Sequence, residues 1–315
     1  MPPYRLLVLL LLTCAELAGG DLQSEIQGII LRSDLHDGTA GVCIINPTSG
    51  ESIVKINADK SMIPASNQKL LTTGAALHVL GPSFTFQTKL VRHEDALIII
   101  GDGDPTIGDR ELHGKATWPL ENAELDAELM LWINAVKQAG MTKITSLLID
   151  DRIFDNNFVH PSWPADQINN WYCAQVAGIN YHLNVVHFYP SPRSNTRAEL
   201  STHADLGDIS PRMQWLTINN KTSSRTGKKD RSSFWVARAP NSNQMTARGN
   251  VKMKHTDPVK IAFHDPPIVF GETFAGLLRK NGISVGEVRR VHPGSTSTGD
   301  VIFIRNTPLQ HTLRR

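Results

Sequence analysis

The chain has 315 residues, of which 40% are hydrophobic and 20% are charged, and its formal net charge is +2. These values are typical of a folded globular protein with room for two domains, and they exclude a chain that is disordered overall. The net charge is weak, and no basic stretch interleaved with aromatic residues is present, so we expect no nucleic-acid partner.

The N-terminus has the pattern of a secretory signal peptide over residues 1–20. Arg5 precedes an apolar run at residues 6–12, and small residues at 18–20 come before a polar segment. The run is too short to span a bilayer, and no later apolar run of about 18 residues follows, so we expect no transmembrane segment in the mature chain. The predicted location is the periplasm or the cell exterior, with peripheral attachment to a membrane left open.

The cysteines and histidines give no sign of a metal site. Cys43 and Cys173 remain after the predicted signal peptide, and in an exported protein they could pair. Because Cys43 lies in an apolar predicted strand and Cys173 in a distant segment, two buried free thiols are an equally good interpretation. The 12 histidines show no His-x-x-x-His spacing. We therefore expect neither a metal nor another cofactor.

The first part of the mature chain predicts a helix, a hairpin and a second helix. Apolar residues recur with helical spacing over residues 26–32. Two β-rich runs, 39–46 and 51–57, are separated by the turn sequence Pro47-Thr48-Ser49-Gly50. A longer helix follows from Ser66 and stops at Gly81-Pro82. Small residues from Gly74 to Ala76 would let this helix pack inside a core.

Strands at residues 85–91 and 96–100 lead into the turn Gly101-Asp102-Gly103-Asp104-Pro105. A glycine-rich turn can bind phosphate, but two aspartates within it would repel an anion, so a tight turn is the better interpretation. A helix over 125–139 and a strand over 144–150 end at Asp150-Asp151. This acidic pair suits either a metal or acid/base site or, more commonly, a cap on the next turn.

The second half of the chain predicts an irregular segment, then short strands, and only little helix. Residues 156–177 form a long irregular segment with Trp163 and Trp171-Tyr172, which we expect to pack on a neighbouring domain or to line a cleft. Short strands are then predicted at 185–189, 213–217, 234–238 and 259–263. A helix at 270–278 follows, then strands at 283–291 and 301–305, and a first helical turn from Pro308.

Ser66 and Lys69 are the candidate catalytic residues. At positions i and i+3 of a helix they share a face, so the lysine amine can reach the serine hydroxyl. A serine is a weak nucleophile until a base takes its proton, and a lysine serves as that base when burial lowers its pKa. The spacing alone is weak evidence, because Ser52 and Lys55 have it too, in a predicted strand where they point to opposite faces.

The surroundings of Ser66 make the pattern more specific, because the chain resembles the D-alanyl-D-alanine carboxypeptidase/endopeptidase family of penicillin-binding proteins over nearly all its mature length. The resemblance is to the low-molecular-mass type with a large insertion after the first catalytic motif. It is carried, in order, by Pro64-Ala65-Ser66-Asn67-Gln68-Lys69, Leu80-Gly81-Pro82, Phe84-Thr85-Phe86-Gln87-Thr88, Gly103-Asp104-Pro105-Thr106, Ile149-Asp150-Asp151, the segment 163–184, Asp265-Pro266-Pro267 and Asn281-Gly282-Ile283.

The resemblance implies an α/β (α+β) fold of the serine β-lactamase and DD-peptidase type. Residues 21–84 and 264–315 would form the catalytic domain, and residues 85–263 one or two mostly-β inserted domains. It further implies serine-type cleavage of D-Ala-D-Ala bonds or cross-links in peptidoglycan. Ser66 would form the acyl-enzyme, Lys69 would act as the base, and the Ser66 backbone N–H would contribute to the oxyanion hole. Peptidoglycan stem peptides would be substrates, and β-lactams would acylate Ser66.

Two further motifs of the family are absent from this sequence. No serine is followed two residues later by asparagine, and Arg225-Thr226-Gly227 is the nearest approach to Lys-Thr-Gly. That triplet lies inside the insertion, so we interpret it as a coincidence. We therefore expect a C-terminally truncated family member whose catalytic domain is incomplete, exposes a sheet edge and an apolar face, and has impaired activity.

Two alternatives stay open. The chain could be a non-catalytic, truncated homologue whose inserted domains bind the cell wall, with Ser66 as a relic. A secreted β-lactamase-like hydrolase shares the first motif, but it lacks the long insertion and is the weaker alternative. Oligomeric state and the choice between carboxypeptidase and endopeptidase activity do not follow from the sequence.

Overall fold

The structure is a computed structural model that describes residues 22–35, 37–109, 125–194, 196–202, 215–224 and 232–314. The predicted signal peptide, residues 1–20, lies outside the described residues. The chain divides into two compact units, Met1–Gly74 and Ala75–Arg315. Each unit is described by itself.

The first unit contains the predicted helix and hairpin. Residues 22–32 are helical, and β1 (Val42–Ile45) pairs antiparallel with β2 (Ser52–Ile56) in a two-stranded sheet. The turn between them is closed by the Asn46 side chain, whose Oδ1 accepts a hydrogen bond from Thr48 N at 2.9 Å. The helix contacts the sheet where Lys55 N donates to Gln23 Oε1 at 3.2 Å. The predicted helix–hairpin order is therefore confirmed.

The predicted helix after the hairpin forms as a short 3₁₀ turn, η1 (Ala65–Asn67), that continues into α2 (Gln68–Leu80). It ends before Gly81, which has the positive φ of 83° that suits a glycine after a helix. No residue of α2 is buried. The prediction that its small residues pack inside a core is therefore not met.

A five-stranded sheet forms the centre of the second unit, in the order β12-β5-β4-β3-β13. Its strands are β3 (Thr85–His93), β4 (Ala96–Ile100), β5 (Lys143–Asp150), β12 (Ser284–Arg290) and β13 (Asp300–Pro308). β12 and β4 run parallel to β5, whereas β3 runs antiparallel to both β4 and β13. β4 is apolar throughout, and its successive residues face opposite sides of the sheet, so Leu97 and Ile99 belong to the main core and Ile98 to a second cluster.

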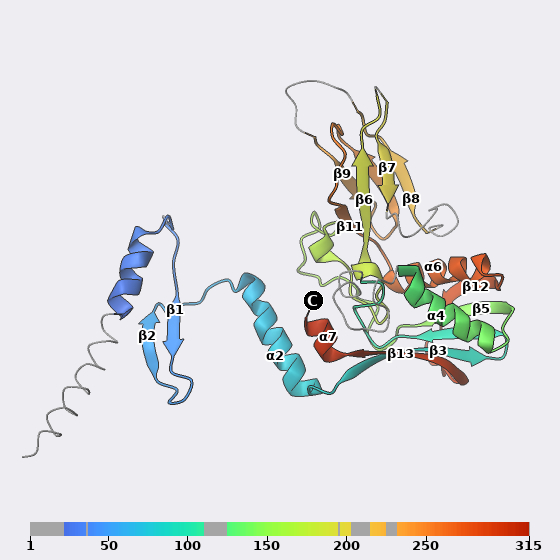
Figure 1. Cartoon of the computed structure of the whole chain (residues 1–315), viewed down its shortest axis with the longest axis horizontal. Helices are drawn as coiled ribbons and strands as arrows, with labels where there is room; N and C mark the ends of the chain where they lie inside the picture. The colour runs from blue at the N-terminus through green and yellow to red at the C-terminus, as the bar shows by residue number, and fades with distance from the viewer. Residues whose placement is uncertain are drawn as a thin grey trace, which may run out of the picture. The chain divides into compact units, whose positions relative to one another are not determined.

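Two helices, α4 (Leu125–Gln138) and α6 (Pro266–Lys280), pack against one face of this sheet (Figure 1). Trp132 from α4 makes edge contacts with Phe270 and Phe274 of α6, with ring centroids 5.5 and 5.8 Å apart. Burial of such large side chains contributes about 1.5–3 kcal/mol each, so this cluster is the main core of the unit. After β13, the last helix α7 (Leu309–Leu313) is anchored by buried Leu309.

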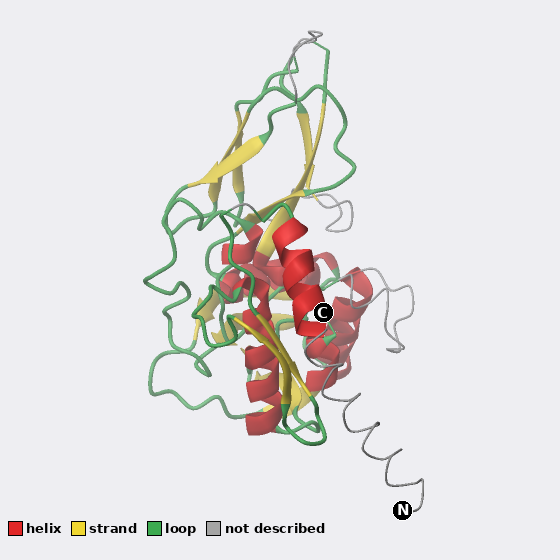
Figure 2. Ribbon diagram, turned by 90° about the vertical axis from the view of Figure 1, so that its left-hand side faces the viewer, coloured by secondary structure: helices red, strands yellow, loops and turns green. Residues whose placement is uncertain are grey.

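Residues 185–262, which lie between β5 and α6 in the sequence, form a β-rich subdomain (Figures 1 and 2). One three-stranded sheet has the order β11-β6-β7 and the other β8-β10-β9. The strands are β6 (Val185–Ser191), β7 (Glu199–Thr202), β8 (Thr217–Asn220), β9 (Trp235–Arg238), β10 (Gln244–Arg248) and β11 (Val259–Ala262). Phe188, Met245 and Ile261 are among the buried side chains that join the two sheets in one core. Helices and several sheets together confirm the mixed α/β fold class.

The assignment of residues 21–84 and 264–315 to one catalytic domain, with 85–263 inserted, stays a prediction. Within the second unit, β12 and β13 complete the sheet of β3, β4 and β5, and α6 packs in the same core. The physical reason is register: Val285 lies opposite Ile144, and Arg305 opposite Thr88, so each late strand covers an edge of the earlier ones.

Candidate active site

Ser66 and Lys69 lie on the first turn of one continuous helical segment, residues 65–80. Ser66 is in η1 and Lys69 is the second residue of α2, so the predicted one-turn separation is present. Both side chains are exposed. Within the described part of the chain, no hydrogen bond joins Ser66 Oγ to Lys69 Nζ. The structure thus places the pair on one helix start without the direct contact that proton transfer requires.

The residue before Ser66 has an unusual backbone. Ala65 has φ 46°, in the left-handed region that residues with a Cβ rarely adopt. Such a conformation costs about 1–3 kcal/mol and occurs preferentially where a functional group must be held in a particular direction. No sequence pattern reveals it, because alanine has no preference for positive φ. This strained residue is a second, independent feature of the Ser66 turn.

The competing Ser52 and Lys55 pair lies on β2, as expected. Ser52 pairs with Ile45 and Lys55 with Cys43 in the antiparallel ladder. Residues three apart on a strand point to opposite faces. Of the two Ser-x-x-Lys pairs, only Ser66 and Lys69 therefore lie on a helix.

The acidic pair at the end of β5 is engaged in ion pairs. Arg152 donates from Nε and Nη2 to the two Asp150 oxygens at 2.7 Å each, and Ser297 Oγ donates to Asp150 at 2.5 Å. Burial alone would raise the pKa of Asp150, but these hydrogen bonds outweigh it and hold the pKa below its usual value. Asp151 accepts from Arg290 Nε at 3.1 Å. The interpretation of a strand-end structural pair is therefore the one that the geometry supports.

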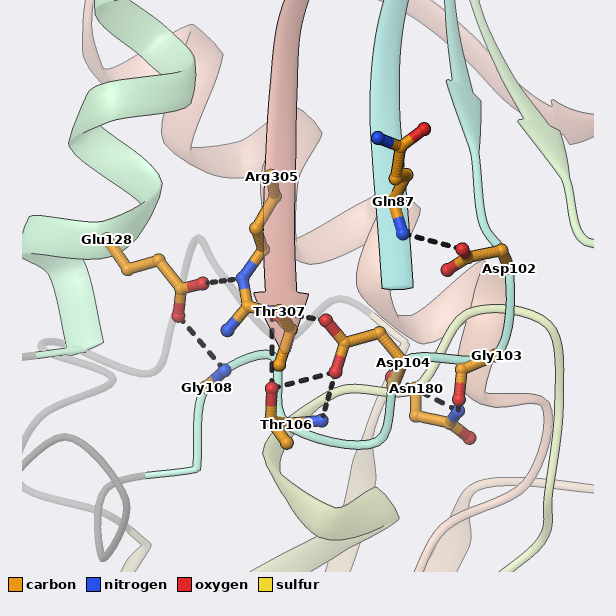
Figure 3. Close-up of polar contacts among 10 residues, drawn as sticks. All are labelled: Gln87, Asp102, Gly103, Asp104, Thr106, Gly108, Glu128, Asn180, Arg305 and Thr307. Carbon is orange, nitrogen blue, oxygen red and sulfur yellow. Dashed lines mark hydrogen bonds and ion pairs between the residues drawn. The ribbon is translucent and has the colours of Figure 1, made fainter. Parts of the chain in front are cut away.

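The Gly101–Pro105 turn contains a buried ion cluster that the sequence did not suggest (Figure 3). Arg305 of β13 forms ion pairs with Asp104 of the turn and Glu128 of α4. Asp104 Oδ1 also accepts hydrogen bonds from Thr106 N at 2.9 Å and Thr106 Oγ1 at 2.7 Å. Glu128 Oε2 accepts from Gly108 N at 3.2 Å. One guanidinium thereby ties together a loop, a helix and a strand.

This cluster is almost fully removed from water. The side chains of Arg305, Asp104 and Glu128 are 6%, 0% and 6% exposed. Burial alone would lower the pKa of Arg305, but the two carboxylates outweigh it and raise that pKa above its usual value. Because a buried ion pair barely offsets its own desolvation, the cluster fixes geometry more than it adds stability. Its members are far apart in sequence, so only tertiary structure could show it.

The other aspartate of the turn, Asp102, lines a surface depression of about 550 Å³ together with Lys89, Asp150 and Arg152. Asp102 Oδ2 accepts a hydrogen bond from Gln87 N at 2.5 Å (Figure 3). Asp102 Oδ1 is buried and has no hydrogen-bond partner among the described residues. Burial raises the pKa of Asp102. Both aspartates of the turn therefore accept hydrogen bonds that hold the loop, which agrees with the interpretation of a tight turn.

The irregular segment, residues 156–177, lines a cleft, which is one of the two arrangements expected from the sequence. A groove of about 500 Å³ runs along residues 155–163, with Trp163 and Val176 among its walls. The chain turns back at Asn180, whose Nδ2 donates to Ala177 O at 2.9 Å and to Asp104 O at 3.3 Å. These bonds fasten the segment to the buried ion cluster.

Three other features concern the described residues only. Cys43 and Cys173 are free, with Cys173 buried, whereas Cys43 is exposed, so the prediction of two buried thiols is wrong for Cys43. No group of three or more His, Cys, Asp or Glu side chains in the described ranges is arranged to hold a metal ion. No helix within those ranges is long and apolar enough to cross a membrane.

With this geometry in place, comparison with known proteins identifies the family. Residues 22–314 match the D-Ala-D-Ala carboxypeptidase 3 (S13) family. The chain belongs to this family. A D-alanyl-D-alanine carboxypeptidase of an Actinomadura species is 25% identical over 278 residues, which cover 84% of this chain and 48% of that protein. A carboxypeptidase of Mycobacterium tuberculosis is 26% identical over 145 residues, 45% of this chain and 30% of that protein.

The fold of this S13 family member is also that of solved structures. Penicillin binding protein 4 of Haemophilus influenzae matches with a TM-score of 0.65 and 19% identity, covering 86% of this chain and 56% of the other. The same protein in complex with a β-lactam matches with a TM-score of 0.57 and 18% identity, covering 86% and 55%. The chain spans about half the length of the Actinomadura relative.

Proposed function

We propose that this chain carries the nucleophile and the base of a serine-type D-Ala-D-Ala carboxypeptidase or DD-endopeptidase of peptidoglycan. The observation that supports this most directly is the position of Ser66 and Lys69 on one helical turn, in a chain that matches the S13 family from end to end of its described part. The strained Ala65 adds to it, because it fixes the direction in which the Ser66 turn leaves the preceding loop.

The proposed reaction is acyl transfer through Ser66. Ser66 Oγ attacks the carbonyl carbon of the terminal peptide bond while its proton passes to the Lys69 amine. The tetrahedral intermediate collapses by breaking the C–N bond, and the leaving D-alanine amine takes the proton. Water then cleaves the Ser66 ester and restores the free hydroxyl. A β-lactam would acylate the same oxygen, and its opened ring would stay attached.

We further propose that these 315 residues alone turn over substrate slowly. Their sequence contains neither Ser-x-Asn nor Lys-Thr-Gly, and catalytic residues of this kind act as a unit, so loss of any member removes most of the rate enhancement. The alternative is a non-catalytic cell-wall-binding homologue. One observation supports this alternative: Ser66 and Lys69 are both exposed, and no hydrogen bond joins their side chains.

Covalent labelling distinguishes the two. The purified chain is incubated with a fluorescent β-lactam and analysed by gel fluorescence and intact-protein mass spectrometry. We expect a one-to-one adduct that is absent from Ser66→Ala and strongly slowed in Lys69→Ala. The matched control is Ser52→Ala, which removes the serine of the other Ser-x-x-Lys pair and should label as the unaltered protein does.

The outcome that contradicts the proposal is equally clear. If the unaltered chain is folded by circular dichroism and cooperative urea unfolding, yet forms no adduct, Ser66 is not a working nucleophile in this chain. An adduct that persists in Ser66→Ala would place the nucleophile elsewhere. Release of D-alanine from a pentapeptide measures turnover separately, and a rate comparable to that of full-length relatives would refute the proposed impairment.

A further inference from the structure

The net charge of the chain is weak, but its positive and negative residues are distributed unevenly along the sequence. Residues 185–262, the β-rich subdomain, contain 13 Lys and Arg but 5 Asp and Glu, a formal charge of +8. Because the whole chain has +2, the remaining residues have −6. A basic domain attached to an acidic remainder is the electrostatic signature of a protein that meets an anionic partner through one part of its surface.

Six of the eight described Lys and Arg residues of this subdomain lie at one end of it; the exceptions are Arg238, at the end of β9, and Lys260, in β11. β6, β8 and β10 all end there, and the segments that follow them are joined by hydrogen bonds. Ser224 N donates to Thr196 O at 2.9 Å, and Val251 N donates to Ser223 O at 2.8 Å. Figure 1 shows β6 pointing toward this end, away from the five-stranded sheet. We call it the basic end; its cationic residues are Arg193, Arg197, Lys221, Arg248, Lys252 and Lys254.

Three cationic side chains of the basic end have no ion-pair partner among the described residues. They are Arg197, Lys221 and Lys254, and all three are exposed. Two described acidic residues lie nearby: Glu199, which is 3.6 Å from Arg193, and exposed Asp257. An exposed pair at that distance is weak and leaves most of the positive field unscreened. Opposite charge on a partner is therefore what this surface complements.

Apolar side chains at the same end indicate the kind of partner. Met253 stands between Lys252 and Lys254 in the sequence and is 66% exposed. Trp235, at the start of β9, is 52% exposed, with the Arg248 guanidinium 5.7 Å from its ring centre. Exposed Trp and Met flanked by Lys and Arg suit a membrane interface, where apolar groups enter the headgroup region and the charges contact phosphates. A soluble polyanion would use the charges alone.

We propose that the basic end is a peripheral docking surface for an anionic phospholipid bilayer. Lys and Arg side chains contact lipid phosphates, and Met253 and Trp235 enter the interfacial layer. This interaction does not depend on Ser66 and would hold the chain at a membrane whether or not the serine reacts. It gives a physical basis for the peripheral attachment to a membrane that the sequence left open.

Vesicle co-sedimentation of the full chain tests the proposal. Vesicles of equimolar phosphatidylglycerol and phosphatidylethanolamine are compared with vesicles of phosphatidylcholine alone. We expect binding to the anionic vesicles that is lost in about 1 M NaCl, where the Debye length falls to about 3 Å. Each basic residue near an anionic surface is worth about fivefold in affinity, so Lys221→Gln with Lys254→Gln should weaken binding about 25-fold.

The matched control removes two lysines elsewhere. Lys137 and Lys143 are exposed on α4 and β5, and replacing both by Gln changes the net charge equally; this variant should bind like the unaltered chain. Every variant has the same N-terminus, so any contribution from the apolar run at residues 6–12 cancels. Ser66→Ala should also bind normally, which separates this result from the outcome of the labelling experiment.

Met253→Ser distinguishes a bilayer from a dissolved polyanion. It should weaken vesicle binding severalfold and leave binding to long-chain polyphosphate unchanged. Equal weakening by both double-lysine variants would show that net charge alone acts and would overturn the proposal. No binding to anionic vesicles, or vesicle binding that is insensitive to Met253→Ser and no stronger than polyphosphate binding, would overturn it as well.

Discussion

Replacing Arg305 by Met should strongly destabilise the second unit. Methionine fills most of the volume of the arginine side chain but removes the guanidinium that pairs with Asp104 and Glu128, whose side chains are 0% and 6% exposed. Removing one partner of a buried ion pair costs about 3–5 kcal/mol. For a unit of this size, each kcal/mol shifts the melting temperature by about 2–4 °C, so we expect a fall of about 10 °C.

Urea unfolding at pH 7, followed by tryptophan fluorescence, measures this effect. Arg289→Met is the matched control, since Arg289 pairs with Glu287 at a surface where both side chains are well exposed; it should cost less than about 1 kcal/mol. An Arg305→Met penalty as small as the control's would refute our account of the cluster.

Two further predictions concern the loop that precedes this cluster. Because burial raises the pKa of Asp102, its contribution to stability is fully present below the unfolded pKa of about 4 and is lost as the pH rises through the folded value. Asp102→Asn should therefore gain stability relative to the unaltered chain between about pH 4 and pH 7 in urea titrations, and a constant difference would contradict the burial argument. Gly101→Ala places a Cβ 2.2 Å from Ile179 Cγ1 and 2.3 Å from Gly178 O, which should cost about 1–3 kcal/mol in the same assay. Gly74→Ala in α2 meets no atom within 4 Å and should stabilise its helix by about 1 kcal/mol, so equal effects from the two glycine variants would show that the close approach is absent.

Local patterns were sufficient for most elements of this fold. The hairpin at β1 and β2 followed from a turn sequence between two β-rich runs, and α2 followed from a helical pattern that stops at Gly81-Pro82. β7 and β10 were missed because each is short and mostly polar, with residues such as Glu199, Gln244 and Arg248. Their pairing is decided by the neighbouring strands rather than by their own composition.

The place of the last strands needed information that no local pattern contains. Helix α6 and strands β12 and β13 were recognised individually, yet which sheet they join depends on register across long sequence separations. The same is true of the Arg305 cluster, whose three charged members come from a loop, a helix and a strand. By contrast, Ser66 and Lys69 lie three residues apart on one helix, so the sequence alone could identify them as candidate catalytic residues. Their catalytic role stays a prediction.

The topology of the five-stranded sheet also bears on how the chain folds. β3, β4 and β5 are made early, but their outer partners β12 and β13 come only after the whole β-rich subdomain. Closing such long loops delays sheet formation, whereas the strands from β6 to β11 pair over shorter sequence separations. During synthesis, the β-rich subdomain can therefore fold first. β3 and β5 meanwhile keep their outer edges unpaired, and this interval is when the chain is most exposed to aggregation and most dependent on chaperones.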